Sequence, residues 1–276
     1  MIDDKASVSL TSLEAAVATL LASDNIETRL FELEGRKYVF KRAREKSWSR
    51  GRACLAALGC RLAFGEWVSP TLLRTGGVQQ EAARLRDLAR AGRRVPTVLL
   101  QTEACIVMSY VGTTFDEIVE NLSADERIAL FERVADDLAD WHVHGCWHGG
   151  AQLRNVSQHL DGQLYRIDFE ERHGYALSTA ATQAYDAFLY FGDAFSHLDA
   201  AEVLSRGGEL LRRYLAQAGN APLLRMLHRL QKLLRPLLWV DARFPKLTQK
   251  RDTRRIVRFA RVVQKELPQF GKQTGA

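Results

Sequence analysis

The sequence contains little cysteine and little proline, and it lacks long apolar runs. Its 276 residues include four Cys and six Pro. The cysteines form no CxxC pair and no Cys/His spacing suited to zinc, so we expect them to be reduced and buried. The longest apolar runs, at 96–100 and 236–240, are far shorter than the roughly 20 residues that cross a bilayer. These absences argue against a disulfide scaffold, a sulfur-ligated metal centre and a membrane-spanning helix.

The sequence also lacks the marks of export, of repeats and of disorder. The segment 1–5 is acidic where a secretory signal would be basic, and no apolar stretch follows it. We therefore expect a cytosolic protein whose membrane contact, if it makes one, is peripheral at the inner face of the cell membrane. No period of roughly 20–50 residues recurs, which excludes a solenoid or a propeller. With 46% hydrophobic and 26% charged residues, the composition is that of a folded globular protein.

The first part of the chain mixes strand and helix patterns. Alternating residues at 27–43, with a turn signal at Glu34-Gly35, predict a hairpin that ends near Lys41. A basic, Trp-containing stretch follows at 46–77, and the composition of 78–91 predicts a helix that ends at Gly92. Two further short strands are predicted at 95–100 and 104–108. We expect a small unit with a mixed β-sheet over residues 1–110.

The second part of the chain is mainly helical. Ser123 and Glu126 form a capping box, and apolar residues at helical spacing follow it as far as Trp141. A short hairpin is predicted at 155–167 around Asp161-Gly162. We therefore expect an α+β fold of two units, the second one covering residues 111–276.

Several residues with chemical potential occur in a distinctive order along these elements. They are Lys41 at a strand end, Glu81 in the next helix, the segment 108–112, His148 followed by Asn155, and Asp168 after a strand. This order and spacing resembles the protein-kinase-like fold, in particular the lipopolysaccharide core (Kdo/heptose) kinases and the Bud32/RIO kinases. The resemblance covers roughly residues 25–195 and implies a two-lobed architecture.

The resemblance implies an ATP site. Lys41 matches the strand lysine that holds the α- and β-phosphates, and Glu81 matches the helix carboxylate that positions it. The segment that begins at Met108 matches the interlobe hinge, where backbone groups of Ser109 and Val111 would bind the edge of adenine. Such a contact uses main-chain atoms, so the side chains there can vary.

The resemblance also implies a magnesium site. Asn155 and Asp168 match the two metal ligands, and their oxygen atoms suit Mg²⁺ that bridges phosphates. Asp186 resembles the buried helix aspartate that braces the catalytic loop. His148 is expected to be a packed loop histidine and not a base.

The sequence departs from the family pattern at two places. The loop reads His148-Gly149-Gly150, so glycine stands where the family has its catalytic aspartate; Gln152, Glu170 and Glu171 are the nearest polar substitutes. A general base of this kind contributes about 10²–10⁴ in rate. The segment 23–28, which corresponds to the nucleotide-covering loop, contains no glycine, although Ser23, Asn25 and Thr28 offer side-chain donors. Glu170 also occupies a position where glycine is usual.

The positive charge of the chain is concentrated near its C-terminus. Residues 225–265 contain thirteen Lys and Arg against two acids, so the net charge of +6 leaves −5 for the rest. Two amphipathic helices are predicted there, at 223–235 and at about 253–267, separated by Pro236 and Pro245. Their cations are either solvated or meet an anionic glycolipid, a membrane surface or nucleic acid. Trp48 and Trp67 could serve the same contact.

These observations leave two functions open. The first is a kinase-like phosphotransferase that uses ATP and Mg²⁺, with a sugar hydroxyl of a lipopolysaccharide core, or a similar anionic glycolipid or protein, as acceptor. The second is a pseudokinase that acts as a binding or scaffold module. Lys41, Asn155 and Asp168 favour the first function, and Gly150 favours the second.

Overall fold

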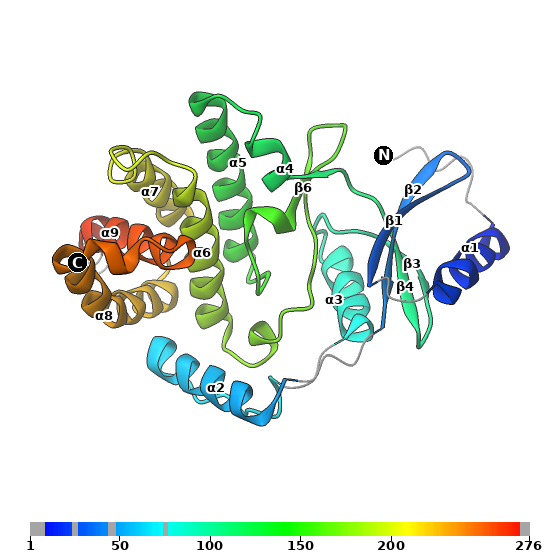
Figure 1. Ribbon diagram of the computed structural model, residues 1–276, viewed down its shortest axis with the longest axis horizontal. Helices are drawn as coiled ribbons and strands as arrows, with labels where there is room; N and C mark the ends of the chain where they lie inside the picture. The colour runs from blue at the N-terminus through cyan, green and yellow to red at the C-terminus, as the bar shows by residue number, and fades with distance from the viewer. Residues whose placement is uncertain (1–8, 24–26, 44–47, 74–76, 271–276) are drawn as a thin grey trace.

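The computed structural model describes residues 9–23, 27–43, 48–73 and 77–270, which form the predicted α+β fold (Figure 1). The strands are β1 (Thr28–Leu33), β2 (Arg36–Arg42), β3 (Val98–Gln101), β4 (Cys105–Ser109), β5 (Thr113–Thr114), β6 (Val156–Gln158) and β7 (Leu164–Arg166). The α-helices are α1 (Leu10–Ala22), α2 (Arg50–Phe64), α3 (Val78–Arg90), α4 (Phe115–Val119), α5 (Ala124–Val143), α6 (Thr179–Ser196), α7 (Arg206–Ala218), α8 (Ala221–Arg243) and α9 (Arg251–Phe270). Short 3₁₀ helices are η1 (Leu153–Asn155), η2 (His173–Tyr175) and η3 (Pro245–Thr248).

A four-stranded sheet has the strand order β1-β2-β4-β3. The predicted hairpin forms β1 and β2, and its turn residues Glu34 and Gly35 have φ of 52° and 73°. Both angles are positive, as the tight turn of a two-residue hairpin requires. The sheet is antiparallel at every pairing, so the expectation of a mixed sheet was wrong; two of its three pairings, β1–β2 and β3–β4, are hairpins, which can only be antiparallel.

Helices cover both faces of this sheet (Figure 1). Cys105 and Val107 of β4 pack in one apolar cluster with α1, whereas Ile106 and Met108 pack in another with α3. This alternation follows from the two-residue period of a strand. Because α3 lies directly on the sheet, its buried face carries the predicted carboxylate Glu81 toward β2.

The larger core lies among α5, α6, α7, α8 and α9. Helix α5 begins with the predicted capping box: the Ser123 hydroxyl accepts from the Glu126 N–H, and the Glu126 carboxylate accepts from the Ser123 N–H at 2.9 Å. The predicted hairpin at 155–167 forms β6 and β7, which join β5 in a second sheet. Among the helices of the described residues, none combines the length and the apolar character that crossing a membrane requires.

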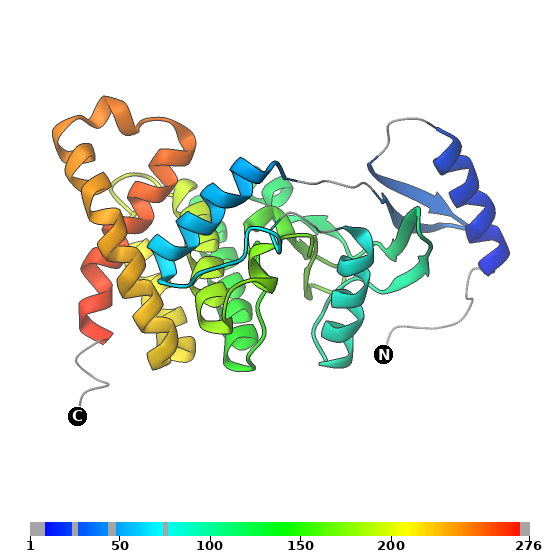
Figure 2. The same ribbon diagram turned by 90° about the horizontal axis from the view of Figure 1, so that it is seen from below.

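The basic stretch at 46–77 contains α2, which lies across the face of the molecule seen in Figure 2 and contacts α8. Its C-terminal continuation is fixed to the segment after β7. The Glu66 carboxylate accepts from the Ser178 N–H at 2.8 Å, and Arg172 donates to the Leu73 carbonyl at 3.1 Å. Cys54 on α2 is exposed, so the expectation that all cysteines are buried was wrong at this position.

The C-terminal helices differ from the prediction at Pro236. Helix α8 continues through Pro236 to Arg243, where the sequence predicted an end. The proline ring is exposed, so it meets solvent, and the helix loses one backbone hydrogen bond there. Four leucines of α8 pack inward as predicted, namely Leu223, Leu224, Leu227 and Leu230, whereas Leu233 is exposed.

Much of the positive charge of α9 is used inside the molecule. Arg255 forms an ion pair with Asp193 at 2.6 Å, and Arg258 donates to the carbonyls of Phe195 and Leu198. Arg261 forms an ion pair with a buried aspartate of α8. These cations stabilise the packing of α9 against α6 and α8, so they are not free for an external ligand.

Candidate functional site

A cleft of about 900 Å³ opens between the four-stranded sheet and the segments around β6 and β7. One part of its wall is apolar and includes Leu30, Val39, Met108 and Ile167. The rest is ionic and includes the residues that the sequence singled out, namely Lys41, Glu81, Asn155 and Asp168, together with Glu170, Glu171, Arg52, Arg154 and Arg172. An apolar slot that continues into a charged floor suits a ligand with a flat ring and an anionic tail.

Lys41 is the centre of the charged floor. Its Nζ lies 2.7 Å from Glu81 Oε2, 2.7 Å from Asp168 Oδ1 and 3.4 Å from Glu170 Oε2. The lysine comes from β2, Glu81 from α3, and the other two acids from the segment after β7. Three parts of the chain that are far apart in sequence therefore converge on one ammonium group.

Burial and charge act in opposite directions on these groups. Burial by itself would lower the pKa of Lys41, but the three carboxylates offset it and hold this pKa above its ordinary value. Burial raises the pKa of Glu81, against the pull of Lys41. Burial also opposes the charge of Asp168, yet Lys41 lowers the pKa of this carboxyl overall. At neutral pH we therefore expect a charged Lys41 that faces a charged Asp168.

Asp168 and Asn155 present oxygen atoms to the cleft. Asp168 has φ of 65°, a left-handed conformation that aspartate tolerates better than most residues. It binds Lys41 through Oδ1, so Oδ2 is the oxygen that can hold a cation. The Asn155 side chain donates from Nδ2 to the Gly150 carbonyl at 2.8 Å, which fixes its rotation and leaves Oδ1 as the ligand atom.

Carboxylate geometry provides a test of whether a cation fits here. Ligand oxygens of Glu81, Asp168 and Glu170 all lie within 4.8 Å of one another. Lys41 neutralises part of their charge, and Glu81 is 1% exposed. Of these three acids, Asp168 and Glu170 have half-exposed side chains, and together with Asn155 they form an all-oxygen donor set of the kind that Mg²⁺ prefers.

The strand β4 leads into the segment that matches the predicted hinge. Met108, Ser109 and Val111 all line the cleft. The Ser109 N–H donates to the Thr97 carbonyl at 2.9 Å, so at Ser109 only the carbonyl remains for a ligand. Val111 lies two residues further along the chain. Gly112 follows with φ of 111°, and any Cβ there would lie 1.9 Å from the Gln158 carbonyl oxygen. Glycine is thus required where this segment passes β6.

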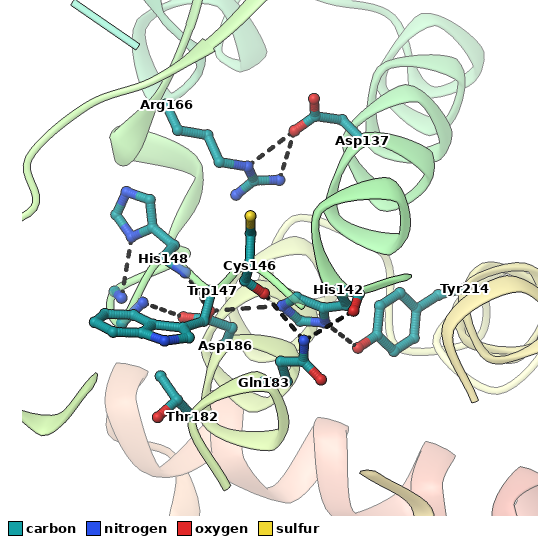
Figure 3. Close-up of polar contacts among 12 residues, drawn as sticks. Asp137, His142, Cys146, Trp147, His148, Arg166, Thr182, Gln183, Asp186 and Tyr214 are labelled. Carbon is teal, nitrogen blue, oxygen red and sulfur yellow. Dashed lines mark hydrogen bonds and ion pairs between the residues drawn. The ribbon is translucent and has the colours of Figure 1, made fainter. Parts of the chain in front are cut away.

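The loop after α5 is braced by Asp186 of α6 (Figure 3). Its carboxylate accepts from the His148 N–H at 2.7 Å and from the Gly149 N–H at 2.8 Å, which agrees with the bracing role expected for it. His148 is buried, and its Nδ1 accepts from the Gly150 N–H at 3.0 Å. Its Nε2 then carries the proton and donates to the Ile167 carbonyl at 2.8 Å. Burial lowers its pKa, so His148 is neutral, and both of its ring nitrogens are engaged in hydrogen bonds of the loop, which makes it a structural residue.

Further buried polar groups support this loop from behind (Figure 3). Gln183 donates to the carbonyls of His142 and Cys146 at 2.9 and 3.0 Å. His142 Nδ1 bonds the Tyr214 hydroxyl at 2.6 Å, and its Nε2 lies 3.6 Å from the Asp186 carboxylate. The loop that carries Gly150 is therefore held by α5, α6 and α7 together.

Gly150 lies directly beneath the side chain of Glu171. A Cβ added at Gly150 would lie 2.8 Å from Glu171 Cγ. Glu171 lines the cleft, its side chain is 38% exposed, and its carboxylate lies 3.7 Å from His173 Nδ1. Glu171 therefore places an acidic side chain over Gly150, where the loop itself has no carboxylate.

The structure brings the predicted residues to one cleft and adds several that sequence reasoning missed. Glu170 joins the Lys41 cluster, whereas the sequence suggested it only as a polar substitute for the missing aspartate and as a departure from a glycine pattern. Arg154 lines the cleft beside Asp168, and Trp48 and Arg52 bring the start of α2 to it. Only the order of the motifs could have pointed to these residues. Of the glycine-poor segment, Thr28 lines the cleft, Ser23 bonds the Leu20 carbonyl, and Asn25 lies outside the described residues.

Comparison with known proteins adds no assignment: no protein-family model matches this chain, and no curated protein matches it.

Proposed function

We propose that this protein is a phosphotransferase of two-lobed, protein-kinase-like fold that uses ATP and Mg²⁺. The observation that carries the proposal is the convergence of Glu81, Asp168 and Glu170 on Lys41 at the floor of the cleft. A fixed, fully charged lysine beside carboxylates that can hold a divalent cation suits the binding of a polyphosphate. The lobes would divide near residue 110, with the cleft between them.

Each part of ATP would have a place in the cleft. The base would lie between Leu30, Val39 and Ile167, with the Ser109 carbonyl and the Val111 N–H at its edge. The phosphates would extend toward Lys41 and Arg154, whose cations offset their charge. Phosphoryl transfer depends mainly on such positioning and charge neutralisation.

Asp168 and Asn155 would hold Mg²⁺, with Glu170 as a further oxygen ligand. When bound, Mg²⁺ neutralises phosphate charge and orients the transferred group. The contribution of the chain is to fix these oxygens: the Gly150 carbonyl holds the Asn155 amide, and Lys41 holds one oxygen of Asp168.

Glu171 is the residue that would replace the missing aspartate at Gly150. The acceptor hydroxyl oxygen would bond to the γ-phosphorus of ATP as the bond to ADP breaks, and the hydroxyl proton would pass to the Glu171 carboxylate. Its side chain covers Gly150, and none of its contacts ties it to Lys41. General-base help of this kind contributes about 10²–10⁴ in rate.

The acceptor that fits best is anionic, for example a sugar hydroxyl of a lipopolysaccharide core or a similar phosphorylated glycolipid. Arg52, Arg154 and Arg172 line the cleft and would attract negative charge. A protein acceptor fits the same charge, and nucleic acid fits it less well because the basic residues of α9 are paired inside the molecule.

The experiment that tests this function measures ATP binding and ATP turnover in the same preparations. We expect Mg²⁺-dependent binding in the wild type, weaker binding in Lys41→Ala, and turnover that falls by about 10²-fold or more in Glu171→Gln without loss of binding. The double variant Gly150→Asp/Glu171→Ala removes the steric conflict and moves the carboxylate to the loop, so it should recover part of this turnover. Failure of the wild type to bind ATP would contradict the proposal.

Gly150 favours a second candidate function, that of a pseudokinase scaffold. In that case the cleft would bind nucleotide, yet neither the wild type nor the Gly150→Asp/Glu171→Ala variant would transfer phosphate. Tight binding with no turnover in either protein would decide for the scaffold.

A further inference from the structure

Helix α2 exposes its leucines and buries two alanines, a cysteine and a phenylalanine. The side chains on its buried face are Ala53, Ala57, Cys60 and Phe64. On the opposite face, Leu55, Leu58 and Leu62 are 71%, 49% and 58% exposed. Their spacing of three and four residues puts them on one stripe of the helix, which we call the α2 face. An isolated exposed leucine is ordinary, but an exposed row on a helix that buries alanine indicates a contact outside the molecule.

The α2 face carries positive charge and no negative charge. Arg50, Arg52 and Arg61 are exposed on this helix, and the sequence has no acid between residues 50 and 65. Trp67, just beyond the helix, is 71% exposed. Leucine, tryptophan and arginine together are the composition of a helix that lies in the interface of an anionic membrane.

A row on α8 extends this surface. The row consists of exposed side chains that follow one another at intervals of three, four or seven residues. They are Arg225, Arg229, Lys232, Trp239 and Arg243. Among the described residues, no hydrogen bond or ion pair involves Arg225 or Lys232. The row meets α2 at Gly65, where the Arg229 guanidinium lies against the backbone. Helices α2 and α8 both lie along the lower side of Figure 1, which is the face toward the viewer in Figure 2.

We propose that the α2 face and the α8 row dock this protein on an anionic lipid bilayer. Leu55, Leu58 and Leu62 would enter the boundary between headgroups and acyl chains, while the cations of the α8 row would bind the headgroup charges. The leucines stand on the outward side of a helix, so they suit insertion into a deformable surface. An occupant that bears negative charge is required, because both elements present only cations around their apolar residues.

Docking in this way would place one end of the cleft at the membrane. Helix α2 begins beside Trp48 and Arg52, both of which line the cleft, and Arg52 stacks on the Trp48 ring at 4.3 Å. A lipid-borne anionic acceptor could then reach the cleft without leaving the bilayer. This consequence for the acceptor rests on the proposed function, whereas the docking itself does not.

The test is co-sedimentation of the full chain with vesicles of phosphatidylcholine alone and with roughly 30% phosphatidylglycerol. We expect binding to the anionic vesicles at about 0.05 M salt and its loss at about 0.5 M salt. The triple variant Leu55→Ser/Leu58→Ser/Leu62→Ser should bind at least about tenfold more weakly. The variant Arg225→Gln/Lys232→Gln should lose roughly tenfold in binding to anionic vesicles only.

A matched control replaces three exposed leucines elsewhere, in Leu99→Ser/Leu160→Ser/Leu204→Ser. It should bind like the wild type, and circular dichroism and thermal unfolding should show that both triple variants are folded. The proposal is overturned if the wild type fails to bind at low salt, or if the two triple variants lose binding equally. It is also overturned if sedimentation shows a dimer that the α2 variant dissociates, since a second copy would then cover this face. ATP binding is measured separately, so failure of docking and failure of the proposed function can be told apart.

Discussion

Replacement of Lys41 by methionine tests the ionic cluster that defines the cleft. The Lys41 side chain is 12% exposed and that of Glu81 is 1% exposed, so both charges are largely removed from water. Removing one partner of a buried ion pair leaves the other charge uncompensated and costs about 3–5 kcal/mol. Lys41→Met retains most of the apolar stem, so the loss should come from charge and not from packing. We expect a decrease of about 3 kcal/mol in the free energy of unfolding near pH 8.

The effect of Lys41→Met should depend on pH in a direction that the structure fixes. Lys41 itself stays protonated in both folded and unfolded states across the range from pH 5 to 8, because its folded pKa is raised. Glu81 has a folded pKa that is already raised by burial, and it loses the lysine that opposed this shift. A raised carboxyl pKa favours folding at low pH and penalises it above the unfolded pKa. The destabilisation should therefore shrink as pH falls toward 5.

Urea unfolding of the wild type, Lys41→Met and Lys41→Met/Glu81→Gln at two pH values measures this directly. The double variant carries no uncompensated charge at Glu81, so it should recover most of the stability that the single variant loses. A single variant that loses less than about 1 kcal/mol, or a double variant no more stable than the single one, would refute this account of the cluster.

Three further predictions concern the elements that hold the site. Gly112→Ala should destabilise the fold by about 2 kcal/mol or more in thermal unfolding, because its Cβ would collide with the Gln158 carbonyl; an unchanged melting temperature would contradict this. Asp186→Ala removes the acceptor of two buried N–H groups, so it should lower the free energy of unfolding in urea by about 3 kcal/mol. It should also broaden the amide NMR signals of the loop at His148, and sharp, unshifted signals would contradict this. Burial lowers the folded pKa of His142 and His148, so the free energy of unfolding should fall as pH drops below about 6.5. The fall should reach about 1.4 kcal/mol per pH unit for each histidine. A His148→Gln variant whose stability keeps the full dependence on pH would contradict the assignment of His148.

The fold and much of the site could be predicted from local patterns. The hairpin turn, the capping box and the amphipathic helix α3 each have a strong signal in a few adjacent residues. Once those elements are placed, the strand-end Lys41 and the buried Glu81 follow from their positions. The contact between Lys41 and Glu81 joins residues that are far apart in the sequence, and only the order of the motifs suggested it.

Other features could not be predicted because they depend on packing between distant segments. Glu171 was one of three polar substitutes that the sequence offered, and its place over Gly150 could not be predicted because the two residues belong to different loops. Pro236 looked like a helix end, but its ring is exposed and α8 continues past it. The cations near the C-terminus looked like a uniform binding surface, whereas several of those on α9 pair with internal acids and carbonyls. Leucines on α2 would ordinarily be assigned to the core.

The most direct test of the central claim is calorimetric titration of ATP with and without Mg²⁺. We predict that Mg²⁺ strengthens ATP binding by the wild type, and that Asp168→Asn abolishes this gain while leaving the protein folded. Asp161→Asn, which changes an exposed aspartate on the turn between β6 and β7, is the matched control and should behave like the wild type. ATP binding that is unaffected by Mg²⁺, or by the change at Asp168, would contradict the assignment of this cleft as a nucleotide and metal site.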